Sequence, residues 1–228
     1  MITIIDYGLG NVQAFTNMYK RLGFDVCRAT NAAELQGATK LILPGVGAFD
    51  HAMELLEASG MRPTLDKLVL KQKVPVLGIC VGMQMLADGS DEGSLSGLGW
   101  IPGRVRAFKR DERSANLPLP HMGWNDVQPK AGTKLFVGLE NDARFYFLHS
   151  FFFECAEPQF AAATTSYGLE FSCAIFSGNV YGVQFHPEKS HHYGAQLLKN
   201  FAELRNVEAK SYSLSAGSRG RARQDCGF

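Results

Sequence analysis

The stretch VPVLGICVGMQ, residues 74–84, decides the fold expected for this chain. Its first seven residues form an apolar run of the kind found in strands that are buried on both faces of a sheet. The run ends at Cys80, and a short helix is expected directly afterwards, over residues 81–86. Because a buried strand followed at once by a helix is typical of α/β proteins, we expect Cys80 at the carboxyl end of a parallel strand.

Upstream of this stretch, strand-like and helix-like segments alternate. Short apolar runs predict the strands, and apolar residues three or four positions apart predict the helices. The expected strands are 2–6, 24–29 and 40–44, and the expected helices are 12–22, 50–56 and 63–70. This alternation predicts a parallel sheet that is covered by helices on both faces.

The second half of the chain changes to short aromatic and β-branched runs separated by turn residues. We expect these runs to extend the same sheet in antiparallel pairing, with a hairpin turn at 177–179 and a last helix at 193–204. The expected strands are 104–108, 144–150, 151–155, 161–166, 172–176 and 180–185. The predicted fold class is therefore α/β, with a single open, mostly parallel sheet, helices on both faces and antiparallel strands added in the second half. This domain would span residues 1–205, and the polar stretch 206–228 is expected to be a mobile tail.

The composition argues against several classes of protein. The 228 residues are 46% hydrophobic and 20% charged, as in a globular domain, and a net charge of +1 gives no electrostatic case for a nucleic acid or a membrane surface as partner. The sequence shows no signal peptide and no apolar run of the ~18 residues that a membrane helix needs. Five widely spaced cysteines do not suggest a disulfide framework, so we expect a reducing location, the cytoplasm or a plastid stroma.

Cys80 lies where a nucleophile is expected. Ligands of open parallel sheets bind at the carboxyl ends of the strands, and backbone N–H groups at the start of a helix favour a thiolate. Glycines at positions 78 and 82 are expected to remove side chains where the backbone turns and a substrate comes close. The pattern is that of a nucleophile elbow with cysteine in place of serine. The alternative is a small buried hydrophobic side chain, which is the usual role of an isolated cysteine.

A thiol nucleophile needs a base, and His186 is the candidate because it follows the strand-like run VYGVQF. Glu188 could orient the ring of His186, as the third member of a catalytic triad does. The alternative is a strand-terminal histidine beside a solvated glutamate. HPEKSHH, residues 186–192, is also considered as a metal site, but no second pair of ligands lies nearby, so no metal is expected.

Two glycine-containing segments follow expected strands. PGVGAF, residues 44–49, has glycines that allow backbone N–H groups to turn toward the oxyanion of an acyl-transfer reaction; the alternative is a plain strand–helix turn. GLG at residues 8–10 resembles the start of a dinucleotide fingerprint, but Gln13 stands where the third glycine is needed. No cofactor is therefore expected.

Together, PGVGAF, GICVGMQ at 78–84 and QFHPEKS at 184–190 resemble the class I glutamine amidotransferases. Four further stretches resemble one branch of that family, the glutaminase subunits of imidazole glycerol phosphate synthase. They are IDYGLGN at 5–11, GLGWIPGRV at 97–105, LPHMGWN at 119–125 and YFLHSF at 146–151. The resemblance covers residues 1–205, with two departures: Val81 stands where leucine is usual, and Phe151 stands where tyrosine is usual.

The resemblance implies that Cys80 attacks the side-chain amide of L-glutamine, giving ammonia and a γ-glutamyl thioester that water cleaves to glutamate. His186 would transfer the protons, and Glu188 would hold His186. The resemblance also implies backbone oxyanion donors among Gly45, Val46, Gly47 and Val81, and glutamine-binding residues Gly47, Gln84, His149 and Ser150.

A partner is implied as well. Ammonia would pass to a separate (β/α)8-barrel chain, the cyclase subunit, for the formation of imidazole glycerol phosphate and AICAR in histidine biosynthesis, and we expect a 1:1 heterodimer. Two alternatives stay open: a subunit that serves an anthranilate or purine-pathway synthase, and a catalytically idle regulatory relative. The residues that match the contact face of the family are Asn11, Trp124, Tyr146 and Lys189.

Overall fold

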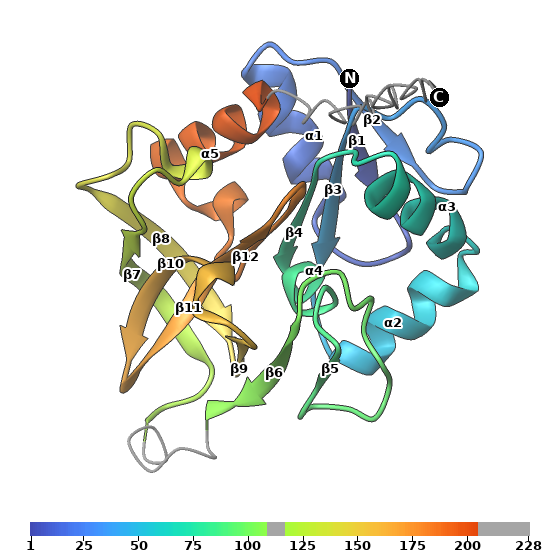
Figure 1. Ribbon diagram of the computed structural model, residues 1–228. Coiled ribbons are helices and arrows are strands. Elements are labelled where there is room, and N and C mark those ends of the chain that lie inside the picture. Colours follow the sequence, from blue (N-terminus) through green and yellow to red (C-terminus); the bar gives the residue numbers. More distant parts are fainter. Residues whose placement is uncertain (109–116, 205–228) are drawn as a thin grey trace, which may run out of the picture.

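The first half of the chain forms a parallel sheet, as its alternating pattern predicts. The structure is a computed structural model that describes residues 1–108 and 117–204 (Figure 1). Four strands lie in the order β2-β1-β3-β4, and β12, from near the end of the chain, pairs in parallel with β4. Their bounds are Ile2–Ile5 for β1, Val26–Ala29 for β2, Lys40–Gly45 for β3, Val76–Cys80 for β4 and Val180–Val183 for β12.

From β12 the same sheet continues through antiparallel strands, in the order β12-β11-β10-β7-β8. Strand β9 joins β11 to β6, and the short β5 pairs in parallel with β6. The predicted open sheet with a parallel start and an antiparallel second half is therefore confirmed, although the sheet is mixed rather than mostly parallel. The bounds are Gly89–Ser90 for β5, Gly103–Ala107 for β6, His121–Pro129 for β7, Ala143–His149 for β8, Phe151–Cys155 for β9, Ala161–Tyr167 for β10 and Leu169–Ser177 for β11.

Helices cover both faces of the parallel strands, with α1 and α5 on one side and α2 and α3 on the other (Figure 1). Helix α1 shows how the sequence sets its ends. The side chain of Asn11 accepts a hydrogen bond from the N–H of Ala14, and Gly23 follows the helix with a φ of +79°. The bounds are Val12–Arg21 for α1, Phe49–Ala58 for α2, Arg62–Asp66 for α3, Val81–Gln84 for α4 and His191–Glu203 for α5.

Three elements differ from the sequence-based expectation, of which the two-residue strand β5 is the smallest. The third helix continues after α3 as a π-helical turn, Lys67–Lys71, so the expected single helix has two parts. Strand β7 was not predicted, because its residues HMGWNDVQP mix glycine and polar side chains with few apolar ones. Its faces nevertheless alternate, with His121 and Val127 buried and Met122 exposed.

The parallel strands form the centre of the hydrophobic core. Ile4, Ile42, Leu77 and Val183 are completely buried, as expected for strands covered on both faces. No helix of the described residues is long and apolar enough to cross a membrane. The tail predicted for residues 206–228 lies outside the described residues.

Candidate active site

Three neighbouring strands bring the predicted motifs to one edge of the sheet. Gly45 of β3 lies opposite Cys80 of β4, and Val183 of β12 lies opposite Ile79. The loop after β3, the elbow after β4 and the segment after β12 therefore start side by side. This register explains how a cysteine and a histidine far apart in the sequence can line one cavity.

Cys80 adopts a strained backbone conformation, with φ +56° and ψ −114°. A positive φ is uncommon for a residue with a side chain, and such strain persists at sites where the surrounding structure requires it. The single-turn helix α4 begins at the next residue, as the elbow pattern predicts. Two contacts of the sulfur are long, 3.9 Å to the carbonyl oxygen of Leu148 and 3.8 Å to Nε2 of Gln184.

The glycines around Cys80 make room for backbone atoms. A Cβ at Gly82 would stand 1.9 Å from the carbonyl oxygen of Leu43, and a Cβ at Gly78 would stand 2.5 Å from the carbonyl oxygen of Gly82. A Cβ at Gly45 would stand 2.4 Å from the backbone nitrogen of Gly82. The expectation that Gly78 and Gly82 clear space for a substrate is therefore corrected: they let the elbow pack directly on β3 and β4.

His186 and Glu188 form the predicted pair. Nδ1 of His186 is 2.9 Å from Oε1 of Glu188, and both side chains are buried. Nε2 of His186 has no partner within hydrogen-bond geometry in the described part of the chain. Burial alone would lower the pKa of His186, but its interactions with Cys80 and Glu188 outweigh burial and raise the pKa to about 10. The pair is thus arranged to stabilise the imidazolium form of His186 beside Cys80.

A cavity of about 300 Å³ opens at this edge of the sheet. Its size suits a small amino acid rather than a polypeptide segment. All four predicted glutamine-binding residues line it, together with two members of the predicted triad. The lining residues are Val46, Gly47, Cys80, Val81, Gln84, Glu92, Pro120, Leu148, His149, Ser150, Phe151, His186 and Lys189.

Gln84 lines this cavity, and its hydrogen bonds fix the orientation of its side-chain amide. Its Nε2 donates to the carbonyl oxygen of Phe151 at 3.3 Å and to Oε1 of Gln184 at 3.0 Å. Because both neighbours only accept at these atoms, the amide nitrogen must face them and the amide oxygen must face the other way. Phe151 therefore contributes through its carbonyl group, which does not depend on the hydroxyl of the usual tyrosine.

His149 lines the cavity, but its ring is already occupied. Nδ1 lies 2.7 Å from the carbonyl oxygen of Phe151, and Nε2 lies 3.0 Å from Nδ1 of His121. Burial lowers the pKa of His149 to about 3 and that of His121 to about 4, so both rings are neutral. The prediction that His149 binds glutamine is thereby restricted: its ring nitrogens bind protein groups, and a ligand could use only its backbone.

The loop after β3 has the predicted freedom. Gly47 has a φ of +86° with open space where a Cβ would stand, and Val46 is 39% exposed. The start of the loop is held from the N-terminal motif, since the hydroxyl of Tyr7 donates to the carbonyl oxygen of Pro44 at 2.9 Å. Burial, and then the charge of Cys80, raise the pKa of Tyr7, which therefore remains a donor.

Four residues of the cavity were not predicted as site residues, Glu92, Pro120, Leu148 and Phe151, and Glu92 is the charged one. Its carboxylate accepts a hydrogen bond from the N–H of Phe49 at the start of α2, at 2.9 Å. Asp50 in turn accepts from the N–H of Ser94 at 2.8 Å, so the loop and the helix hold each other. Glu92 lies in the polar run SDEGSLSG, residues 90–97, whose composition is that of any solvated loop, so the sequence carried no specific signal for it.

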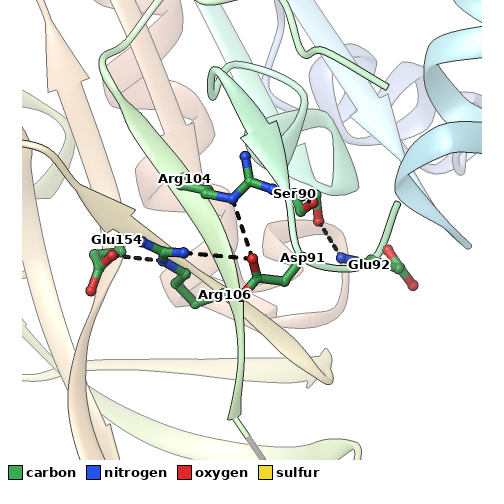
Figure 2. A network of polar contacts seen from close by, with 6 residues as sticks. All are labelled: Ser90, Asp91, Glu92, Arg104, Arg106 and Glu154. Atoms are coloured by element: carbon green, nitrogen blue, oxygen red, sulfur yellow. Dashed lines mark hydrogen bonds and ion pairs between the residues drawn. The ribbon is translucent and has the colours of Figure 1, made fainter. Parts of the chain in front are cut away.

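Ion pairs hold the segment that precedes Glu92 (Figure 2). Asp91 lies between two arginines of β6, with Oδ1 3.2 Å from Nε of Arg104 and 3.5 Å from Nη1 of Arg106. Arg106 also pairs with Glu154 of β9, at 2.7 Å. The Asp91 side chain is 3% exposed, so this network fixes the backbone next to Glu92 more firmly than an exposed ion pair would.

Three of the four predicted contact residues lie together on the outer side of β7, β8 and the turn Pro187–Lys189. The rings of Trp124 and Tyr146 meet edge to face at 6.4 Å, and Nζ of Lys189 lies 5.7 Å from the ring centre of Tyr146. His191 adds a stacked ring on Trp124 at 5.4 Å. The fourth, Asn11, is exposed and caps α1, and among the described residues no hydrogen bond joins its side chain to the other three.

A metal site and reactive thiols other than Cys80 are the remaining candidates. No group of three or more histidine, cysteine or carboxylate residues within the described ranges is placed to hold a metal ion. Cys27, Cys80, Cys155 and Cys173 are free thiols. Cys27 and Cys173 lie within strands, as predicted, and burial raises the pKa of Cys173.

Comparisons with known proteins identify the family of this chain. The model of the glutamine amidotransferase class-I family matches residues 3–204. The imidazole glycerol phosphate synthase subunit HisH of Bdellovibrio bacteriovorus is 66% identical over 204 residues, which is 90% of this chain and 100% of the relative. The subunit HisH of Leptospira interrogans is 50% identical over the same shares of both chains.

Solved structures show the same fold at lower identity. A crystal structure of a glutamine amidotransferase superposes with a TM-score of 0.70 at 20% identity, covering 89% of this chain and 97% of that one. A glutamine amidotransferase from Thermotoga maritima gives a TM-score of 0.58 at 18% identity, over 88% of this chain and 81% of that one.

Proposed function

The chain belongs to the class I glutamine amidotransferases and, within them, to the HisH glutaminase subunits of imidazole glycerol phosphate synthase, and from this premise we propose that Cys80, His186 and Glu188 are its catalytic triad. The observation that carries the assignment is the shared cavity, in which the strained Cys80 and the Glu188-bound His186 lie together. The relatives at 66% and 50% identity set aside the anthranilate and purine-pathway alternatives.

The reaction proceeds through a thioester. His186 takes the proton of the Cys80 thiol, and the sulfur attacks the side-chain amide carbon of glutamine. The tetrahedral intermediate collapses by breaking the C–N bond, and His186 returns the proton to the leaving nitrogen, which departs as ammonia. A water molecule, deprotonated by His186, then cleaves the thioester to glutamate and restores the thiol. Glu188 holds the ring of His186 through Nδ1 and stabilises its charged form.

The oxyanion of each tetrahedral intermediate needs donors close to Cys80. The N–H of Val81 is one, since it starts α4 directly after the nucleophile. The segment Gly45, Val46 and Gly47 is the source of the second. Gly47 already has a positive φ and open surroundings, which support a peptide rotation that turns an N–H group into the cavity.

Two residues of the cavity offer acceptors that suit glutamine. Gln84 and Glu92 both line the site, and the Gln84 amide oxygen and the Glu92 carboxylate could accept from the α-ammonium group and the amide NH2 of a free amino acid, which only donate. Gly47 and Ser150 line the same space and would contact the substrate through backbone or hydroxyl groups.

The released ammonia is useful only when it is delivered unprotonated. We therefore propose that the chain docks, as one half of a 1:1 heterodimer, onto a separate cyclase barrel that uses ammonia to form imidazole glycerol phosphate and AICAR. The outer face of β7 and β8 supports this docking, since Met122 is 64% exposed and Trp124 is 38% exposed, beside Tyr146 and Lys189. The free thiols in the described part of the chain support a location in the reducing cytoplasm.

Cys80→Ala tests the assignment. The mutant complex should form no product from glutamine, because the nucleophile is gone, but it should still form product from concentrated ammonium salt at a pH high enough to supply ammonia. Cys27→Ala is the matched control and should retain both activities. Glutamine-dependent turnover by Cys80→Ala would exclude Cys80 as the nucleophile. Loss of the ammonia-dependent reaction with a folded partner would mean that this chain contributes to the synthase site itself.

A further inference from the structure

Two buried histidines outside the proposed triad form a pair on neighbouring strands. His121 of β7 lies opposite His149 of β8, and both are almost completely buried, at 4% and 6% exposure. His121 is stacked between Phe147, at 4.9 Å, and Tyr167, at 4.1 Å. Burying imidazoles in an aromatic cluster is costly unless their nitrogens are hydrogen-bonded, and aromatic side chains could fill the same space. The presence of two histidines here, rather than two aromatic residues, therefore needs a functional explanation.

The direction of the hydrogen bonds is fixed at the outer end by Asn125. Its Nδ2 donates to the carbonyl oxygen of Ser166 at 2.9 Å, and its Oδ1 accepts from the N–H of Asp126 at 2.9 Å. The amide can therefore face His121 only with its nitrogen, which lies 3.3 Å from Nε2 of His121. Nε2 of His121 must accept, so the proton of this ring is on Nδ1.

The same reasoning fixes the position of the proton on His149. Nδ1 of His121 donates to Nε2 of His149, 3.0 Å away, so the proton of His149 must be on its Nδ1. That proton points to the carbonyl oxygen of Phe151, at 2.7 Å. Both ends of the chain of bonds agree, because a carbonyl oxygen can only accept. We call Asn125, His121 and His149 the histidine relay.

The relay ends on an atom that the active site uses. The carbonyl oxygen of Phe151 also accepts from Nε2 of Gln84, whose second bond goes to Gln184, and Nε2 of Gln184 is 3.8 Å from the Cys80 sulfur. If the relay ran in the opposite direction, an unprotonated Nδ1 of His149 would face the carbonyl at 2.7 Å. The two lone pairs would repel each other, and the carbonyl that orients Gln84 would move.

Building on the proposed glutaminase function, we propose that His121 and Asn125 are positioning residues for glutamine: through the protonation pattern of His149 they fix the Phe151 carbonyl and so the amide of Gln84. None of the three touches the reacting atoms with its relay nitrogens. Their effect falls on the binding of glutamine and leaves the ammonia-dependent reaction of the partner unchanged.

The first test uses the unaltered chain in complex with its cyclase. With ¹⁵N-labelled histidine, the ring nitrogens of His121 and His149 should each give a protonated signal at Nδ1 and an unprotonated signal at Nε2. The opposite pattern at His149 would overturn the proposal. This measurement requires no variant to fold.

The second test is kinetic. Asn125→Asp removes the donor that faces His121, and His121→Phe keeps the aromatic stack but removes the bond to His149. Both variants should raise KM for glutamine about tenfold, with a smaller change in kcat and no change in ammonia-dependent turnover. Asn141→Asp, at an exposed loop position, is the matched control and should behave like the wild type.

Wild-type KM for glutamine in both variants would overturn the proposal, and so would equal losses of glutamine-dependent and ammonia-dependent turnover, because the effect would then lie in folding or docking. Failure of the wild-type complex to use glutamine at all would instead refute the proposed function, which keeps the two failures distinct.

Discussion

Gly82→Ala should damage stability and catalysis together, because this glycine lets the elbow pack on β3. The new Cβ would stand 1.9 Å from the carbonyl oxygen of Leu43, whereas ordinary contacts begin at 3.4 Å. The two segments would have to separate by about 1.5 Å in a close-packed region. Overpacking of this kind costs about 1–3 kcal/mol or more, and the better helix propensity of alanine returns at most about 1 kcal/mol.

We therefore expect a net loss of about 2 kcal/mol, or a fall in Tm of about 4–8 °C for a domain of this size. The elbow also carries Cys80, and a displacement of about 1 Å at a reacting group can reduce the rate by about 10²-fold. Thermal unfolding by circular dichroism and glutamate release in complex with the cyclase measure the two effects.

Gly60→Ala is the control for the general cost of replacing a glycine. Gly60 has a φ of +67° but open space around its missing Cβ, so the change should cost about 1 kcal/mol of backbone strain and leave glutamine hydrolysis intact. Gly82→Ala with wild-type Tm and wild-type glutaminase activity would refute the packing argument.

Three further predictions concern thiol reactivity, pH and the tail. A glutamine-like chloroketone should modify Cys80 ahead of the other thiols, Cys173 included, since burial raises the pKa of Cys173; peptide mapping that finds the main label elsewhere would contradict this. Because the pKa values of His121 and His149 are lowered to about 4 and about 3, the unfolded chain takes up protons below pH 6.5 before the folded one does, and the folded state loses stability as the pH falls. Between pH 7 and 5 the free energy of unfolding, measured by urea titration at each pH, should fall about 2 kcal/mol less in His121→Phe than in the wild type. An equal fall in both proteins would contradict buried neutral rings. Deleting residues 206–228, which lie beyond the family match, should change the free energy of unfolding by less than about 1 kcal/mol, and a Tm many degrees lower would contradict it.

The sequence predicts the site best where the chemistry depends on strand ends. Cys80 and His186 each follow an apolar run, so parallel pairing alone brings them to one edge, and Glu188 follows two residues after His186. The order of the strands could not be predicted, because it depends on which strands pair with each other across long stretches of sequence. Neither Glu92 nor the relay could be predicted: a carboxylate in a polar loop and a histidine in an unpredicted strand acquire their roles only from neighbours distant in sequence.

Strand β7 serves two purposes on its two faces. His121 and Asn125 point inward to the relay, while Met122 and Trp124 point outward to the proposed docking face. A scan of all substitutions along this strand should therefore give a fitness profile with a period of two. Substitutions at His121 and Asn125 would act through the supply of nitrogen from glutamine, and those at Met122 and Trp124 through affinity for the cyclase. Cells grown with abundant ammonium would relax the constraint on His121 and Asn125 alone, so substitutions along one short strand would separate two selective pressures.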